Sequence, residues 1–134
     1  MSEPGDNLAR LVAAWTAMLR SGESSALAGL LDEGVVWQGL LPEMVCSDRQ
    51  QVLRILGRRG SRPLRITRVE AEEFGERVAI SVEGPDFAAL AGEAEAPLLA
   101  AGAARSLVFT FRDGRVVRME SLPSREAAFA LAAG

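Results

Sequence analysis

The amino-acid sequence predicts an α+β fold in which helices precede a mostly antiparallel sheet and a short helix follows it. Three patterns support this prediction. Apolar residues from Leu8 to Leu19 recur at the i, i+3, i+4, i+7 spacing of an amphipathic helix. Residues 78–83 alternate between apolar side chains and small or polar ones, which is typical of a half-buried strand. Residues 106–121 form two apolar stretches separated by an Asp-Gly pair, which favours a β-hairpin.

The N-terminal part of the chain is expected to form two helices and one short strand. The first helix runs from Asp6, its expected N-cap, to the Ser-Gly pair at 21–22. A second, shorter helix covers residues 25–31. Residues 35–38 are expected to form a strand that ends at a glycine, and residues 40–46, which include a proline, are expected to form a loop.

A capping box predicts where the third helix begins. Ser47 is followed three residues later by Gln50, so the two side chains can satisfy free backbone N–H groups at a helix start. We expect this helix to end near residues 57–60. Its expected inward-facing residues are Val52, Leu53 and Leu56.

Two strands are expected next, at residues 64–74 and 77–83, joined by a Gly-Glu turn. The apolar residues of the first strand change parity, which predicts a bulge near residues 67–68. Residues 87–104 are rich in alanine, as a helix would be, but two glycines and a proline interrupt them, so no element is assigned there. Pro123 and the three residues after it begin a final Ala-rich helix.

The register of the C-terminal hairpin is decided by its apolar pattern. A two-residue loop would place Arg118 and Glu120 on the apolar face of the preceding strand, whereas a three-residue loop over 112–114, closed by a glycine bulge, would not. Because a one-residue slip exchanges the two faces of a strand, we expect the three-residue loop. The predicted apolar face consists of Leu107, Phe109, Phe111, Val117 and Met119.

Composition limits the classes of protein and of chemistry that the chain can represent. Its 134 residues, 49% of them hydrophobic and 25% charged, predict one globular domain over 1–134, with no membrane segment and no signal peptide. A lone cysteine, Cys46, excludes an internal disulfide and favours a cytoplasmic location. Histidine, tyrosine and lysine are absent, so imidazole or phenol catalysis and Schiff-base chemistry are excluded, and we expect neither a metal site nor a cofactor.

The order of these elements resembles the nuclear transport factor 2-like superfamily, and within it the SnoaL-like branch. The local signatures are Trp15 on the first helix, Val-Val-Trp at 35–37, the cap at Ser47 and Phe-Thr-Phe at 109–111. The resemblance implies a strongly curved sheet wrapped around the three helices as a cone, with an apolar pocket inside. It also implies a homodimer formed through the outer face of the sheet.

The resemblance does not assign a reaction, because the superfamily contains isomerases, dehydratases, polyketide cyclases, epoxide hydrolases and non-catalytic binding modules. In the ketosteroid isomerase branch, the phenol donor would fall at about Trp15, the catalytic aspartate at about Gln38 and the buried acid at about Leu107. All three positions lack the required group. We therefore do not expect steroid isomerisation by that mechanism, and the epoxide hydrolase clusters have no match either.

The expected pocket residues combine apolar wall with one polar group. Gln38 is expected to point into the cone, on the same face as Val36, where its amide could bind a ligand carbonyl or be satisfied by backbone. Core packing explains the remaining wall residues equally well. The expected set is Trp15, Met18, Gln38, Leu107, Phe109, Met119 and Ser121.

Without histidine, a base would have to be a carboxylate. Glu83 and Asp86 flank a Gly-Pro pair at a strand end, and Glu43 lies in the loop after the first strand. A partly desolvated carboxylate there could have a raised pKa and act as a general base, although solvated surface positions explain all three. We expect Cys46 to be a buried thiol beside the third helix.

Seven arginines fall within residues 49–68, where no acid occurs, and acids follow at 70–76. Nucleic-acid binding is not expected, because the net charge is −3 and no aromatic residue is interleaved. The sequence thus favours a cytoplasmic homodimer that binds a small apolar molecule. The alternatives are a cofactor-independent cyclase, dehydratase or isomerase with a carboxylate base, and a non-catalytic dimerisation module with a filled core.

Overall fold

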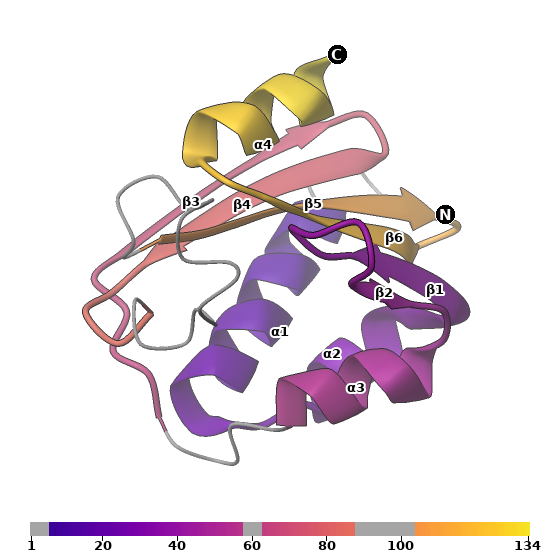
Figure 1. Cartoon of the computed structure of the whole chain (residues 1–134), viewed down its shortest axis with the longest axis horizontal. Helices are drawn as coiled ribbons and strands as arrows, with labels where there is room; N and C mark the ends of the chain where they lie inside the picture. Colours follow the sequence, from indigo (N-terminus) through magenta and orange to yellow (C-terminus); the bar gives the residue numbers. More distant parts are fainter. Residues whose placement is uncertain (1–5, 58–62, 88–103) are drawn as a thin grey trace.

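The computed structural model describes residues 6–57, 63–87 and 104–134, which form four helices and one six-stranded sheet (Figure 1). The elements are α1 (Asp6–Ser21), α2 (Ser25–Leu30), β1 (Leu31–Gln38), β2 (Val45–Cys46), α3 (Arg49–Gly57), β3 (Arg68–Phe74), β4 (Arg77–Glu83), β5 (Ala104–Arg112), β6 (Arg115–Leu122) and α4 (Arg125–Ala133). None of the helices in the described part of the chain is both long and apolar enough to cross a membrane.

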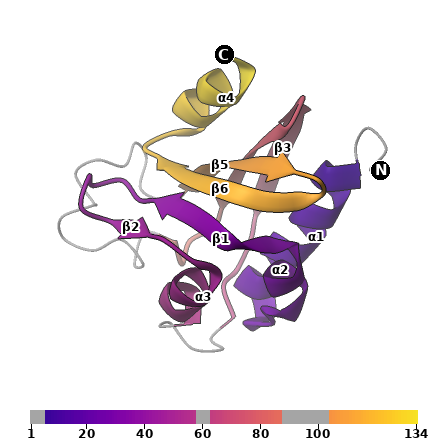
Figure 2. The ribbon, with the colours of Figure 1, turned by 90° about the vertical axis from the view of Figure 1, so that its right-hand side faces the viewer.

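The strands lie in the order β2-β1-β6-β5-β4-β3. Neighbours are antiparallel except β1 and β6, which are parallel, so β3 to β6 form an antiparallel meander. Figure 2 shows β1 between β2 and β6, with α2 and α3 on one side of it. The predicted α+β cone, an open curved sheet packed on three N-terminal helices, is confirmed.

The two faces of the sheet carry different helices. Helices α1, α2 and α3 lie on the inner face, and α4 lies on the outer face (Figure 1). The inner face holds the main core, in which β4 contributes Val78, Ile80 and Val82. On the outer face, Ala79 and Val108 pack against Ala128 and Ala132 of α4. The small side chains allow this helix to lie close to the strands.

The C-terminal hairpin differs from the predicted one in its loop. Arg112 pairs with Arg115, so the loop has two residues, and Asp113 and Gly114 both have positive φ, as in a type I′ turn. The register changes after the next pair, Phe111 with Val116, because Thr110 then pairs with Arg118 and leaves Val117 as the extra residue. The expected three-residue loop is therefore wrong, because a bulge inside the strand makes the same correction.

This bulge also changes which valine is buried. Val116, opposite Phe111, is fully buried, whereas Val117, which was expected in the core, is half-buried. Beyond the bulge, Phe109 pairs with Met119, and both belong to the apolar face that the sequence predicts. An extra residue within one strand restores the alternation, so both the loop and the apolar face adopt favourable arrangements.

Three other boundaries differ from the sequence-based expectations. β1 begins at Leu31, four residues earlier than expected, and Val45 and Cys46 form a short strand against Trp37 and Gln38 where a loop was expected. The expected bulge near 67–68 is absent from the described pairing, because β3 itself begins there. Residues 88–103 lie outside the described part of the chain.

Helix α3 is capped one residue later than expected. Asp48 Oδ1 accepts the backbone N–H of Gln51 (2.8 Å), and Gln51 Oε1 accepts the backbone N–H of Ser47 (2.7 Å). Asp48 and Gln51 therefore act as the cap pair, and the expected pair of Ser47 and Gln50 is wrong. Both pairs fit the same spacing rule, so the rule alone does not distinguish them.

We predict that Asp48→Ala destabilises the protein by about 1 kcal/mol, because it removes the side chain that caps α3. Ser47→Ala is the matched control and should change the free energy of unfolding much less, since Ser47 contributes through its backbone N–H. Urea unfolding of the two variants measures this difference. A larger loss for Ser47→Ala would contradict the cap.

A second prediction concerns Gly84, which is buried where the chain leaves β4. A Cβ atom there would overlap the carbonyl oxygen of Arg65 and lie 3.0 Å from the ring of Phe87. We expect Gly84→Ala to cost about 1–3 kcal/mol through this overlap. The control is Gly29→Ala in α2, where a Cβ meets nothing within 4 Å and alanine favours the helix. Equal unfolding free energies for the two variants would refute the close approach.

Candidate functional site

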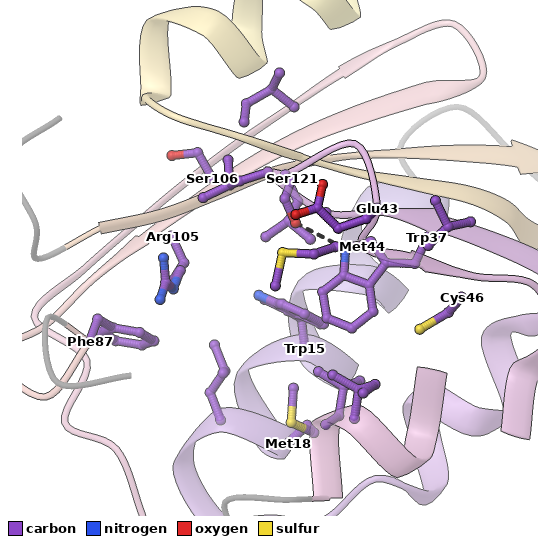
Figure 3. Close-up of a pocket in the computed structure, with 18 residues that line it drawn as sticks. Trp15, Met18, Trp37, Glu43, Met44, Cys46, Phe87, Arg105, Ser106 and Ser121 are labelled. Atoms are coloured by element: carbon purple, nitrogen blue, oxygen red, sulfur yellow. Dashed lines mark hydrogen bonds between the residues drawn. The ribbon is translucent and has the colours of Figure 1, made fainter. Parts of the chain in front are cut away.

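A cavity of about 550 Å³ lies between α1, α3 and the inner face of the sheet (Figure 3). This volume falls within the range of sites that hold small molecules. The described residues that line it are Trp15, Met18, Leu19, Trp37, Gly39, Leu40, Glu43, Met44, Val45, Cys46, Ile55, Leu56, Phe87, Arg105, Ser106, Leu107, Ser121 and Leu122.

The cavity begins at the point on the inner face of β5 and β6 where large core side chains are followed by smaller ones. Phe109 pairs with Met119, and both are fully buried in the core and do not line the cavity. The next inward pair is Leu107 with Ser121, which line it. Side-chain volume therefore falls sharply along the two strands, and the core gives way to open space.

Helix α1 forms the wall opposite these strands. Trp15 and Met18, three residues apart, face the cavity as the helical spacing requires. The Trp15 ring packs edge-on against Phe109, with ring centroids 5.2 Å apart and an interplanar angle of 72°. This contact fixes the indole at the border between core and cavity.

The two tryptophans of the site differ in hydrogen bonding. Trp37 Nε1–H donates to Ser121 Oγ at 2.9 Å. The side chain of Trp15 is buried, with the residue 3% exposed, and its Nε1 has no hydrogen-bond partner among the described residues. One indole donor is thus satisfied by protein, and the other is not.

The loop after β1, the start of β2 and one residue of α3 form an apolar rim. Met44, Val45 and Ile55 line the cavity yet are 39%, 46% and 36% exposed. Gly39 holds the loop in place, because its N–H donates to the carbonyl oxygen of Met44 (2.7 Å) and an added Cβ would lie 2.7 Å from the Met44 Cβ. The opening of the cavity to solvent is therefore lined mainly by apolar side chains.

Phe87 and Arg105 form another side of the wall (Figure 3). Phe87 is 1% exposed, and the turn that leads to it is fixed by Asp86, which accepts the backbone N–H of Arg65 (2.9 Å) and its guanidinium (3.1 Å). The hydrogen bonds and the charge of Asp86 raise the pKa of the Arg65 guanidinium.

Several expected pocket residues do lie at the cavity, namely Trp15, Met18, Leu107 and Ser121. Gln38 does not, and its expected inward orientation is wrong. It pairs with Glu120 on the outer-face row, while Trp37 pairs with Met119 on the inner row. The Gln38 amide instead donates to loop carbonyls, among them that of Leu41 at 3.0 Å.

The three candidate acids are separated by the fold. Glu43 lies on the rim and lines the cavity. Glu83 has the same strand parity as Ala79, which packs beneath α4, and is not among the lining residues. Asp86 is also absent from the lining and is bonded to Arg65. Of the three, Glu43 is the one that could meet a ligand.

The cavity wall also contains three residues that the sequence did not predict there, Trp37, Phe87 and Arg105. Strand parity could have found Arg105, because it lies two residues before Leu107 on the same face of β5. Alternation along β1, counted from the inward-facing Val35, would have predicted that Trp37 also faces inward. Phe87 had no local signal, since its position depends on the turn held by Asp86.

Cys46 is half-buried and lines the cavity, where a buried thiol beside α3 was expected. Among the described residues, no three carboxylate or thiol side chains are grouped so that they could hold a metal ion. Three described arginines of the basic segment form ion pairs: Arg49 with Glu33, Arg65 with Asp86 and Arg68 with Glu70.

Comparisons with known proteins assign the fold. The sequence matches no protein-family model and no curated protein. Among solved structures, a nuclear transport factor 2-like protein from Anabaena variabilis superposes with a TM-score of 0.63 at 14% identity, covering 92% of this chain and 94% of that one.

Two further structures agree. A Pseudomonas putida protein provisionally named a polyketide cyclase gives a TM-score of 0.60 at 14% identity, with 92% and 96% of the two chains covered. A Catenulispora acidiphila protein with a ketosteroid isomerase-like fold, in complex with trimethylamine, gives 0.58 at 16% identity, with 91% of each chain covered. The chain has the fold of the nuclear transport factor 2-like superfamily.

Proposed function

We propose that this protein binds a small, mostly apolar molecule in the cavity between α1, α3 and the sheet. The observation that carries the proposal is a space of about 550 Å³ whose wall is largely hydrocarbon and aromatic. Protein interiors are otherwise close-packed, and unfilled space costs stability. A chain with no ligand would gain stability from larger side chains at Leu107 and Ser121.

The solved structures are compatible with this proposal. One protein of the same fold was crystallised with trimethylamine, so the fold can hold a small molecule. Neighbours of this fold carry names of enzymes as well as of proteins of unknown function. Their identity to this chain is too low to transfer a substrate.

A second candidate function is a cofactor-independent cyclase, dehydratase or isomerase reaction. The observation that favours it is the position of Glu43 on the rim of the cavity, where a carboxylate could take a proton from a bound substrate. Glu43 is exposed, as a solvated surface carboxylate would be. Ligand binding is therefore the primary proposal.

The homodimer and the cytoplasmic location suggested by the sequence stay predictions. α4 covers part of the outer face, against β4 and β5. We expect a dimer to use the remainder of that face, on β1 and β6. Native mass spectrometry reports the oligomeric state and the mass of any retained ligand together.

We predict that N-phenyl-1-naphthylamine, an uncharged apolar dye, binds saturably with one site per chain. Leu56→Trp should weaken this binding by about tenfold or more, because Leu56 lines the cavity from α3 and a larger side chain fills it. The matched control is Gln50→Trp, an exposed position on the same helix outside the lining. Dye fluorescence measures binding, and thermal unfolding checks both variants. Equal binding by both would place the dye elsewhere.

We also predict that Glu43→Gln leaves dye affinity nearly unchanged, since the amide matches the carboxylate in size and the dye has no charge. If native mass spectrometry yields a substrate, Glu43→Gln should abolish its turnover under the enzymatic candidate. Glu83→Gln, away from the cavity, is the control. Full turnover by Glu43→Gln would exclude Glu43 as the base.

A further inference from the structure

We propose that the ligand of this cavity carries a carboxylate, and that Trp15 Nε1–H and the Arg105 guanidinium bind it. This inference rests on the proposed ligand-binding function and specifies the class of ligand. It follows from the hydrogen bonding of the cavity and from the placement of its charged side chains.

The first observation is the unused donor of Trp15. Its side chain is buried and its Nε1 has no partner among the described residues, although buried polar groups are normally paired. An indole N–H can only donate, so the missing partner must be an acceptor. In Figure 3 the indole nitrogen faces the side of the cavity that holds Arg105 and Phe87. A ligand oxygen placed there would satisfy it.

Two other donors of the wall have protein partners, in contrast to Trp15. The Trp37 N–H is bonded to Ser121 Oγ at 2.9 Å. The hydroxyl of Ser106 is bonded to that of Ser81, also at 2.9 Å. Two indoles therefore line one cavity, and the one with the free donor is the one that can recognise a ligand.

The second observation is the location of charge. Among the described residues that line the cavity, two are charged, Arg105 and Glu43. Arg105 has the strand parity of Leu107, so β5 directs it to the inner face, and it is half-buried. Guanidinium groups favour carboxylates through charge-assisted hydrogen bonds. The assignment does not require Arg105 to lack a protein partner, because a guanidinium carries five donors.

The position of Glu43 indicates which end of the ligand lies at the rim of the cavity. The residue is exposed on the loop beside Met44, where its negative charge disfavours a second carboxylate. The apolar rim formed by Met44, Val45 and Ile55 suits the hydrocarbon part instead. The ligand class that fits both ends is an apolar monocarboxylic acid. A neutral ketone or ester could use the Trp15 donor but not the charge of Arg105.

The test is displacement of bound N-phenyl-1-naphthylamine by decanoate and by methyl decanoate, which differ in charge but share the hydrocarbon chain. We expect decanoate to bind the wild-type protein at least about tenfold more tightly than its ester, as a charge-assisted hydrogen bond predicts. Trp15→Phe and Arg105→Gln should each reduce this preference by about tenfold while the dye still binds.

Two controls separate recognition from structural damage. Trp37→Phe removes an indole N–H that is already bonded to Ser121, so it should change the ratio of acid to ester affinity much less than Trp15→Phe does. Arg112→Gln removes an exposed arginine from the same strand as Arg105 and should leave the ratio unchanged. If Trp15→Phe does not fold, the wild-type ratio and Arg105→Gln still decide the matter.

The outcomes distinguish this inference from the function on which it rests. Equal displacement by acid and ester, displacement by neither, or a ratio that survives both Trp15→Phe and Arg105→Gln would overturn the carboxylate assignment. Binding of the dye in those cases would leave the proposed function intact. Absence of any saturable dye binding by the wild-type protein would overturn both.

Discussion

The contact between α1 and the inner face of β5 is the constraint on which the rest of this structure depends. Trp15 packs edge-on against Phe109, and this contact joins the first helix to the centre of the sheet. On one side of it, the pairs Phe109–Met119 and Phe111–Val116 fill the core. On the other side the strands carry Leu107 and Ser121, and space opens. This aromatic contact thus lies at the boundary between the packed core, which stabilises the fold, and the cavity, which can bind a ligand.

The sequence predicted the elements that local signals specify. Helical periodicity gave α1, a Gly-Glu turn gave the β3–β4 hairpin, and the Pro-Ser start gave α4, where Ser124 Oγ accepts the backbone N–H of Ala127. Sequence patterns that are compatible with two different structures gave less reliable predictions. A three-residue loop and an internal bulge produce the same strand faces, so the apolar pattern could not choose between them.

The site was less predictable because it depends on contacts between distant segments. Val45 and Cys46 form too short a strand to show a pattern, yet their pairing with β1 places Met44 and Val45 on the rim. Gln38 was misplaced because the parity of β1 was counted from Val36 rather than from Trp37. Arg105 lay within reach of the same parity rule, but the strand was expected to begin at Ser106, one residue after it.

The most direct measurement is the response of the two indole N–H groups to an acid. A ¹⁵N-labelled sample should show two indole resonances, one for each tryptophan, and Trp15→Phe assigns them. We expect decanoate to shift the Trp15 resonance strongly, as its N–H gains an acceptor, and to move that of Trp37 much less, because its bond to Ser121 persists. A saturating titration that leaves Trp15 unmoved, or moves only Trp37, would contradict a ligand site built on the free donor of Trp15.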